Sequence, residues 1–353
     1  MGFYIPYISA RFGSKIIPLS NFSGNSTEPA GSSQGICCFG AYDMAGNVKE
    51  WCWNETPAGH IIRGGAWNDP TYMYSDMSQL PSFDRSSKNG FRCVQYIDKE
   101  NIPESAFQLI KNIEGWYGYS GERDFSKETP VEDKIFEIYK NQFLYDKIDL
   151  KDKIEKTDSS NKDWIIEKIT FNTAYGKERI IAYLFLPRNA SPPYQTLMFW
   201  PGLNATFEDS LIKSDWKWHL DFILKSGRAI MYPVYYRTFE RKDGPLPAEG
   251  HQLTDWAIKD VKDFRRSIDY LETRSDIDTG KIGFYGASWG ASAGPLTSIE
   301  DRIKVNILIV GGFNGALLPE VHAINYVSRV KIPTLMLNGR YDYRYNLDIN
   351  VRP

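Results

Sequence analysis

Residues 281–290 read KIGFYGASWG, and this stretch decides how the second half of the chain folds. Its first five residues are typical of a buried strand, and Ser288 follows at the centre of a G-x-S-x-G pattern, before a helix. A turn between strand and helix this tight needs small residues around the serine, which Gly286 and Gly290 provide. The pattern predicts that Ser288 points out over the carboxyl ends of the strands as a candidate nucleophile. The alternative is an ordinary strand-to-helix turn.

Short apolar runs alternate with amphipathic segments on both sides of this turn, from residue 164 onwards. Continuous apolar strands separated by helices predict an α/β fold, with a parallel sheet covered on both faces. The first two strands, joined through Gly176, are expected to form an antiparallel hairpin at the sheet edge. Strands are expected at 164–171, 179–186, 196–200, 229–234, 281–285, 303–310 and 334–337, and long amphipathic segments at 211–225 and 253–273.

Two further parts of a catalytic site are expected near Ser288. A developing oxyanion needs two backbone N–H groups aimed at it. One should come from Trp289, and the other from the Pro-Gly step after the third strand, at Leu203 or else Gly202; a plain turn is the alternative for that step. An acid should follow a later strand, and Asp342 stands there after a glycine turn, where it would orient a histidine.

The histidine base is the difficulty. The expected chain order is serine, acid and then histidine, yet residues 343–353 contain no histidine. His251 lies in a loop near the expected site and is assigned to substrate binding. His219 is expected to be packed, and His322 to lie at the surface or to cap a helix. A serine without a positioned base is a poor nucleophile at neutral pH, so this chain is expected to be nearly inactive.

The chain from residue 164 to 353 resembles the α/β-hydrolase domain of dienelactone hydrolases and acetyl-xylan esterases. The resemblance rests on GASWG at 286–290, WPGLN at 200–204 and Asp342, in this arrangement. It implies a doubly wound, mostly parallel sheet and hydrolysis of small-molecule carboxylic esters or related acyl substrates, without a cofactor. Domains of this class continue through another strand and helix with the histidine between them, so the resemblance implies a truncated domain. The alternative is a non-catalytic binding module, a pseudoenzyme.

The first hundred residues are rich in Gly, Trp, Tyr and Asn and predict loops and short strands. Three segments, YDMAGNVKEW at 42–51, RGGAW at 63–67 and GFRC at 90–93, resemble the C-terminal half of a formylglycine-generating, sulfatase-modifying-factor domain. The resemblance implies an irregular, C-type-lectin-like fold that is present here only in part.

The same resemblance implies a calcium ion at the D-x-x-G-N-x-x-E run. Carried over by position, Asp43 and Glu50 would give side-chain oxygens, and Gly46 and Val48 backbone carbonyls. Hard oxygen ligands from one short loop suit calcium. The alternative is a loop without metal.

Two activities are not expected. The cysteine pair that oxidising members of this family carry after their Gly-Gly segment is replaced here by Asp69 and Tyr74, so formylglycine generation should be absent. The domain order resembles the C-terminal part of bacterial serine/threonine kinase fusions and implies a kinase domain in the full-length protein. This chain carries no kinase motif, so kinase activity is not expected.

The composition and net charge of the chain narrow the functional classes that remain. The chain is 42% hydrophobic and 24% charged, as in ordinary globular proteins, and its net charge of -2 favours neither nucleic acid nor an anionic membrane as partner. No apolar run approaches the length of about 20 residues that spans a bilayer, and a cytoplasmic protein is expected. Three parts are predicted: a partial sulfatase-modifying-factor-like domain at 1–97, a helical linker at 98–160 and the α/β-hydrolase domain at 161–353.

Overall fold

The computed structural model divides into two compact units, Met1–Trp116 and Tyr117–Pro353, called here the first and the second unit. The structure describes residues 19–22, 24–33, 35–37, 40–56, 59–69, 77–98, 100, 102, 104–107, 125–206, 208–214, 216–242, 250–313, 317–339, 345 and 347–352.

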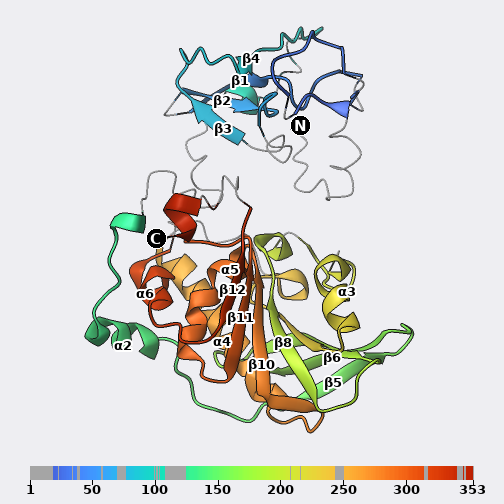
Figure 1. Cartoon of the computed structure of the whole chain (residues 1–353), viewed down its shortest axis with the longest axis vertical. Coiled ribbons are helices and arrows are strands. Elements are labelled where there is room, and N and C mark those ends of the chain that lie inside the picture. The colour runs from blue at the N-terminus through green and yellow to red at the C-terminus, as the bar shows by residue number, and fades with distance from the viewer. Residues whose placement is uncertain are drawn as a thin grey trace. The chain divides into compact units, whose positions relative to one another are not determined.

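The second unit is built on an eight-stranded sheet with the order β12-β11-β10-β8-β9-β7-β6-β5 (Figure 1). Neighbours from β9 through β8, β10 and β11 to β12 are parallel, whereas the pairs on the β5 side are antiparallel. The sheet is therefore mixed but mostly parallel, as predicted. The strands are β5 (Lys153–Asp158), β6 (Trp164–Asn172), β7 (Arg179–Pro187), β8 (Tyr194–Trp200), β9 (Ala229–Val234), β10 (Ile277–Ala287), β11 (Ile303–Ile309) and β12 (Thr334–Leu337).

Helices cover both faces of this sheet, as Figure 1 shows for α3 and α4. Alternate side chains of β8 point to opposite faces. Met198 and Trp200 join the core cluster that contains α4, whereas Leu197 and Phe199 join the cluster that contains α3. The α-helices are α2 (Asp133–Asn141), α3 (Lys217–Lys225), α4 (Gly250–Leu271), α5 (Trp289–Ser292) and α6 (Ile324–Val327). The short helices are η6 (Phe125–Lys127), η7 (Leu203–Thr206), η8 (Phe239–Arg241), η9 (Gly294–Ile299), η10 (Pro319–Val321) and the π-helix η11 (Leu347–Val351).

All seven predicted strands are present, but the predicted sheet edge is wrong. β6 and β7 form the expected hairpin, with Gly176 in the left-handed region at φ +57°. β5 pairs antiparallel with the other side of β6 and is the outer strand. Every residue of β5 is exposed. It therefore lacks the apolar alternation by which a strand is recognised in sequence, and its residues had been assigned to the linker.

The structure also differs from the predicted linker in residues 125–160. The helix expected there forms as α2, but Phe136, Phe143 and Leu150 are buried in the core cluster of the second unit. The guanidinium of Arg265 donates to the Phe143 carbonyl at 2.8 Å. This segment is thus part of the second unit, because its apolar side chains pack against the sheet and its helices. The other predicted domain boundaries stay predictions.

The first unit consists of loops and short strands, as predicted. Its four-stranded sheet has the order β3-β2-β1-β4, in which β1 pairs antiparallel with β2 and parallel with β4. The elements are β1 (Lys49–Thr56), β2 (Gly59–Arg63), β3 (Met77–Leu80), β4 (Asn89–Gly90) and the short helix η4 (Glu104–Phe107). Within the described ranges of both units, no helix has the length and apolar character needed to cross a membrane.

Candidate active site

Ser288 stands alone between the end of β10 at Ala287 and the start of α5 at Trp289. Its backbone has φ +51° and ψ -110°, a conformation that non-glycine residues rarely adopt. The Ser288 N–H donates to the carbonyl of Ile309, at the end of β11, at 2.8 Å. Strained backbone of this kind persists only where its surroundings over-determine it, and it occurs preferentially at functional sites.

Close backbone contacts require glycine at the positions on either side of Ser288. A Cβ on Gly286 would lie 2.5 Å from the carbonyl oxygen of Gly290, and a Cβ on Gly290 would lie 2.1 Å from that of Trp200. Both distances are far below van der Waals contact, and the atoms met are backbone. The turn therefore tolerates no side chain at these two positions.

The loop after β8 packs directly against this turn. The Gly290 N–H donates to the Pro201 carbonyl at 3.0 Å, and a Cβ on Gly202 would lie 3.3 Å from the Ser288 Cβ. Leu203 begins η7 and Trp289 begins α5, and the first N–H groups of a helix have no acceptor within it. Within the described part of the chain, no residue accepts either N–H. The turn at Ser288 and Trp289 is thus brought into contact with the loop at Gly202, and the N–H groups of Trp289 and Leu203 have no acceptor among the described residues.

A second tryptophan, Trp256, flanks the turn and was missed in the sequence. It lies in α4, is 3% exposed, and stacks on Trp289 with ring centroids 5.1 Å apart and planes 6° from parallel. Its indole N–H donates to the Tyr236 carbonyl at 3.1 Å. Nothing in the sequence pairs residues 256 and 289, so no local signal could have found this contact.

Asp342, the expected acid, lies outside the described residues. The chain before Asp342 is bonded to the loop that follows β11, and the chain after it is bonded to α5. Before it, the Asn338 amide donates to the Gly311 carbonyl at 2.7 Å. After it, the Ser292 hydroxyl of α5 donates to the Tyr345 hydroxyl at 2.9 Å. The flanks of Asp342 therefore reach the end of β11 and the helix that follows Ser288.

The four histidines are all described, and none forms a hydrogen bond with Ser288. His251 lies in the first turn of α4 and not in the expected loop; it is exposed, and its assignment to substrate binding stays a prediction. His219 lies in α3, where burial lowers its pKa. His322 is 1% exposed and stacks on Phe125, so the expected surface position is wrong because two aromatic rings enclose it. The expected capping position is confirmed: His322 follows the last residue of η10, and its Nδ1 accepts the N–H of Ile324, the first residue of α6, at 3.2 Å. His60 belongs to β2 of the first unit.

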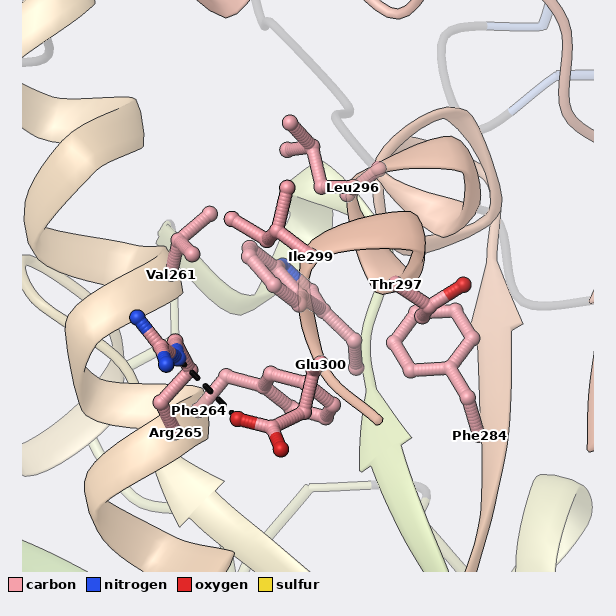
Figure 2. A pocket seen from close by; sticks show the side chains of 10 residues that line it. Val261, Phe264, Arg265, Phe284, Leu296, Thr297, Ile299 and Glu300 are labelled. Atoms are coloured by element: carbon pink, nitrogen blue, oxygen red, sulfur yellow. Dashed lines mark hydrogen bonds and ion pairs between the residues drawn. The ribbon is translucent and has the colours of Figure 1, made fainter. Parts of the chain in front are cut away.

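The pocket drawn in Figure 2 is separate from this site. It is a narrow gap between α4 and η9, with Val261 and Phe264 on one side and Leu296 and Ile299 on the other. An ion pair between Arg265 and Glu300, with 3.0 Å between Nε and Oε2, lies at its rim. None of the predicted site residues lines it. This gap in the packing is therefore not the place where a substrate would meet Ser288.

The residues assigned to calcium in the first unit are engaged with protein partners. The Asp43 carboxylate accepts the Gly31 N–H at 2.5 Å and the Ser33 hydroxyl. Both carboxylate oxygens of Glu50 accept hydrogen bonds from Arg92, at 2.8 and 3.1 Å. Gly46 and Val48 lie in the bend that precedes β1. The Arg92 guanidinium occupies both oxygens of Glu50, so this arrangement does not fit a bound calcium ion. Calcium binding stays a prediction, and it requires Glu50 to release Arg92 and bind the ion in its place.

Asp69, which stands where the oxidising enzymes have a cysteine, has structural contacts. Its carboxylate accepts the Ala66 N–H at 2.9 Å and pairs with Lys49 Nζ at 3.3 Å. Tyr74, at the second cysteine position, lies outside the described residues.

Comparison with protein families matches residues 10–97 to the sulfatase-modifying factor enzyme 1-like domain. Comparison with curated proteins found no match. Among solved structures, an acetyl xylan esterase from Paenibacillus sp. R4 is similar at 16% identity and a TM-score of 0.43, over 59% of this chain and 80% of that one. Acetyl xylan esterase 1 from Thermoanaerobacterium sp. JW/SL YS485 has 15% identity and a TM-score of 0.47, over 63% and 83%. A glucuronoyl esterase from Solibacter usitatus has 17% identity and a TM-score of 0.37, over 53% and 59%. The α/β fold of the second unit is established by its strand order and helix placement.

Proposed function

We propose that the second unit carries the acyl-transfer centre of a serine hydrolase acting on small carboxylic esters. The observation that carries this proposal is the contact between the strained Ser288 turn and the Gly202 loop, since the N–H groups of Trp289 and Leu203 in these two segments have no acceptor among the described residues. Donors already in place when charge develops are the largest single contribution to many acyl-transfer reactions.

In the proposed reaction Ser288 Oγ attacks the ester carbonyl carbon and gives up its proton. The carbonyl oxygen gains the negative charge and receives hydrogen bonds from the N–H groups of Trp289 and Leu203, with Gly202 as the second choice. The bond to the leaving alkoxide then breaks, and the alkoxide takes a proton. Water then attacks the carbonyl carbon of the acyl-serine and gives up a proton. The bond to Ser288 Oγ breaks, Oγ takes a proton back, and the carboxylic acid is released. These proton transfers need a histidine base, which Asp342 is proposed to orient and which none of the four histidines in residues 1–353 is placed to supply.

The rate of ester hydrolysis expected of this chain depends on proton transfer from Ser288. All four histidines are described and none forms a hydrogen bond with Ser288, so none of them is placed as its base. We propose that residues 1–353 alone hydrolyse esters at a rate near background. Reaction with a strongly electrophilic reagent depends less on a base and reports on the serine and its N–H groups.

A fluorophosphonate probe followed by peptide mass spectrometry tests the proposal. Ser288 is expected to be labelled, and the Ser288→Ala variant is expected to lose the label. Ser298→Ala is the matched control, because the Ser298 hydroxyl is buried and makes no hydrogen bond among the described residues. Labelling that persists in Ser288→Ala, or an unlabelled wild-type chain, would remove Ser288 from the chemistry.

The second candidate is a binding module without catalysis, favoured by the absence of a histidine hydrogen bond at Ser288. An unlabelled wild-type chain that unfolds cooperatively would support this candidate. The predicted calcium binding of the first unit is compatible with both candidates, because no step of the proposed reaction involves that unit.

A further inference from the structure

The segment that would supply the oxyanion donor is too short to hold itself in place. α5 spans only Trp289–Ser292, and a helix of one turn has little stability of its own. The neighbouring residues are fixed by hydrogen bonds, Ser288 to Ile309 and Gly290 to Pro201. Trp289 lies between them, and its own N–H is the one that must stay free to serve as a donor.

The side chain of Trp289 is held by stacking. Among the described residues its indole Nε1 is buried and has no hydrogen-bond partner. One face of its ring lies parallel to Trp256, at 5.1 Å between centroids. Stacked aromatic pairs add about 0.5–1.5 kcal/mol beyond the area they bury. The orientation of Trp289 therefore depends on where Trp256 stands.

Trp256 is itself held at both ends. It lies in the second turn of α4, a helix of 22 residues, and its indole N–H donates to the Tyr236 carbonyl in the loop after β9. The adjacent loop residue, Arg237, has φ +62°. A buried tryptophan with a satisfied N–H and a parallel ring partner is a rigid support, whereas α5 alone is not.

We propose, on the basis of the serine hydrolase function above, that Trp256 is a positioning residue for the oxyanion donor. Its ring, fixed by the hydrogen bond to Tyr236, fixes the ring of Trp289 and through it the backbone N–H beside Ser288. Trp256 touches neither the substrate nor the reacting atoms. An N–H group contributes to catalysis only while it is aimed at the oxyanion, and a misplacement of about 1 Å costs up to about 100-fold in rate.

The test compares three variants of the full chain. Trp256→Ala removes the ring and the hydrogen bond, whereas Trp256→Phe keeps a ring and loses the hydrogen bond. Trp216→Phe is the matched control: Trp216 is 5% exposed and packs against Trp164 and Phe185 on the other face of the sheet.

Two readouts are measured at a temperature where every variant is folded. The first is hydrogen–deuterium exchange of the amides of residues 286–292, which is expected to accelerate in Trp256→Ala, less in Trp256→Phe and not in Trp216→Phe. The second is the rate of Ser288 labelling by the fluorophosphonate, expected to fall about 10- to 100-fold in Trp256→Ala, with partial recovery in Trp256→Phe.

The two readouts separate this inference from the proposed function. Unchanged exchange of residues 286–292 in Trp256→Ala would overturn the positioning role, whatever the labelling shows. Equal slowing of labelling in Trp216→Phe would also overturn it, because the effect would then be one of general stability. An unlabelled wild-type chain would contradict the hydrolase, and the exchange data alone would still decide whether Trp256 holds Trp289.

Discussion

The carbonyl of Pro201 accepts the N–H of Gly290 at 3.0 Å, and this bond joins the loop after β8 to the helix that follows Ser288. The two residues are 89 positions apart, but β8 and β10 are neighbours in the sheet, paired in parallel at Gly286 and Trp200. Parallel strands end at the same edge, so the segments leaving them meet there. This hydrogen bond joins the Pro-Gly loop and the serine turn, which are separate motifs in the sequence, at the candidate site.

Replacing Gly290 should separate the two loops. A Cβ there meets the Trp200 carbonyl at 2.1 Å, so Gly290→Ala is expected to destabilise the second unit by about 1–3 kcal/mol and to abolish labelling of Ser288. Urea unfolding and fluorophosphonate labelling measure the two effects. Gly280→Ala is the control, since its Cβ meets only the Asp278 side chain, at 3.3 Å. Wild-type stability of Gly290→Ala would mean that the loops do not touch.

Replacing Gly202 should slow the reaction of Ser288 more than it lowers the stability of the second unit. A Cβ at this position meets the Asn204 side chain, at 2.9 Å, which can turn away, and lies 3.3 Å from the Ser288 Cβ. Gly202→Ala is therefore expected to keep its unfolding midpoint but to slow Ser288 labelling by roughly 10-fold, because the shifted loop misaims its N–H. Labelling at the wild-type rate would place the second oxyanion donor elsewhere.

Arg302 should govern the acid stability of the second unit. Burial is the largest single effect and raises the pKa of both Asp269 and Glu300. The hydrogen bonds and charge of Arg302, together with Tyr145 and Lys147 at Asp269 and with Arg265 at Glu300, outweigh it, and both pKa values lie below their ordinary range. Arg302 stands 2.7 Å from each carboxylate. Groups with lowered pKa stabilise the fold above their unfolded values of about 4, and this contribution is lost as the pH falls below them.

Arg302→Gln is therefore expected to lower the unfolding free energy at pH 7 by roughly 3 kcal/mol and to flatten its decline between about pH 5 and pH 3. Urea unfolding across this pH range is the measurement. Arg228→Gln is the control, because Arg228 is exposed and its guanidinium donates to the nearby Ser226 hydroxyl and to no carboxylate among the described residues. An unchanged pH slope in Arg302→Gln would show that other carboxylates control acid unfolding.

Asp260 should oppose stability at neutral pH. It is 1% exposed, and its Oδ1 has no hydrogen-bond partner among the described residues. Burial, and then the neighbouring Asp263, raise its pKa well above the ordinary value. For a carboxyl with raised pKa, stability is lost as the pH rises from the unfolded value of about 4 towards the folded one. Asp260→Asn is thus expected to be more stable than the wild type by about 1–3 kcal/mol at pH 8, with a smaller gain at pH 5.

Urea unfolding of Asp260→Asn at the two pH values measures this difference. Asp255→Asn serves as the control in the same helix, since Asp255 is exposed. A destabilised Asp260→Asn at pH 8 would show that the ionised carboxylate is needed in the core.

Calcium binding by the first unit should depend on Arg92. Both Glu50 oxygens bond to Arg92, and the pKa of Arg92 is raised chiefly by that hydrogen bond, so the ion must compete with a guanidinium. Arg92→Gln is expected to increase the shift in melting temperature produced by calcium, and Glu50→Gln to remove it. Arg85→Gln, at an exposed arginine of the same unit, is the control. No calcium-dependent shift in any of these proteins would leave the loop without metal.

Local patterns in the sequence were sufficient for most of the fold. Each predicted strand is an apolar run of its own, and the Ser288 turn has its glycines within two positions, so both can be recognised in a short window. The order of strands in the sheet could not be obtained this way. β5 was missed because all its residues are exposed, and the packed second half of the linker was missed because Phe143 and Leu150 stand outside any helical repeat.

For the candidate site, the sequence by itself determined which residues are chemically suited: a serine in a turn that needs glycine, and helix starts whose N–H groups stay free. Only the tertiary structure decided what holds them. The stacking of Trp256 on Trp289 and the pairing of Glu50 with Arg92 join residues more than thirty positions apart. Such contacts depend on how strands and helices pack in three dimensions, and periodicity along the chain carries no information about that.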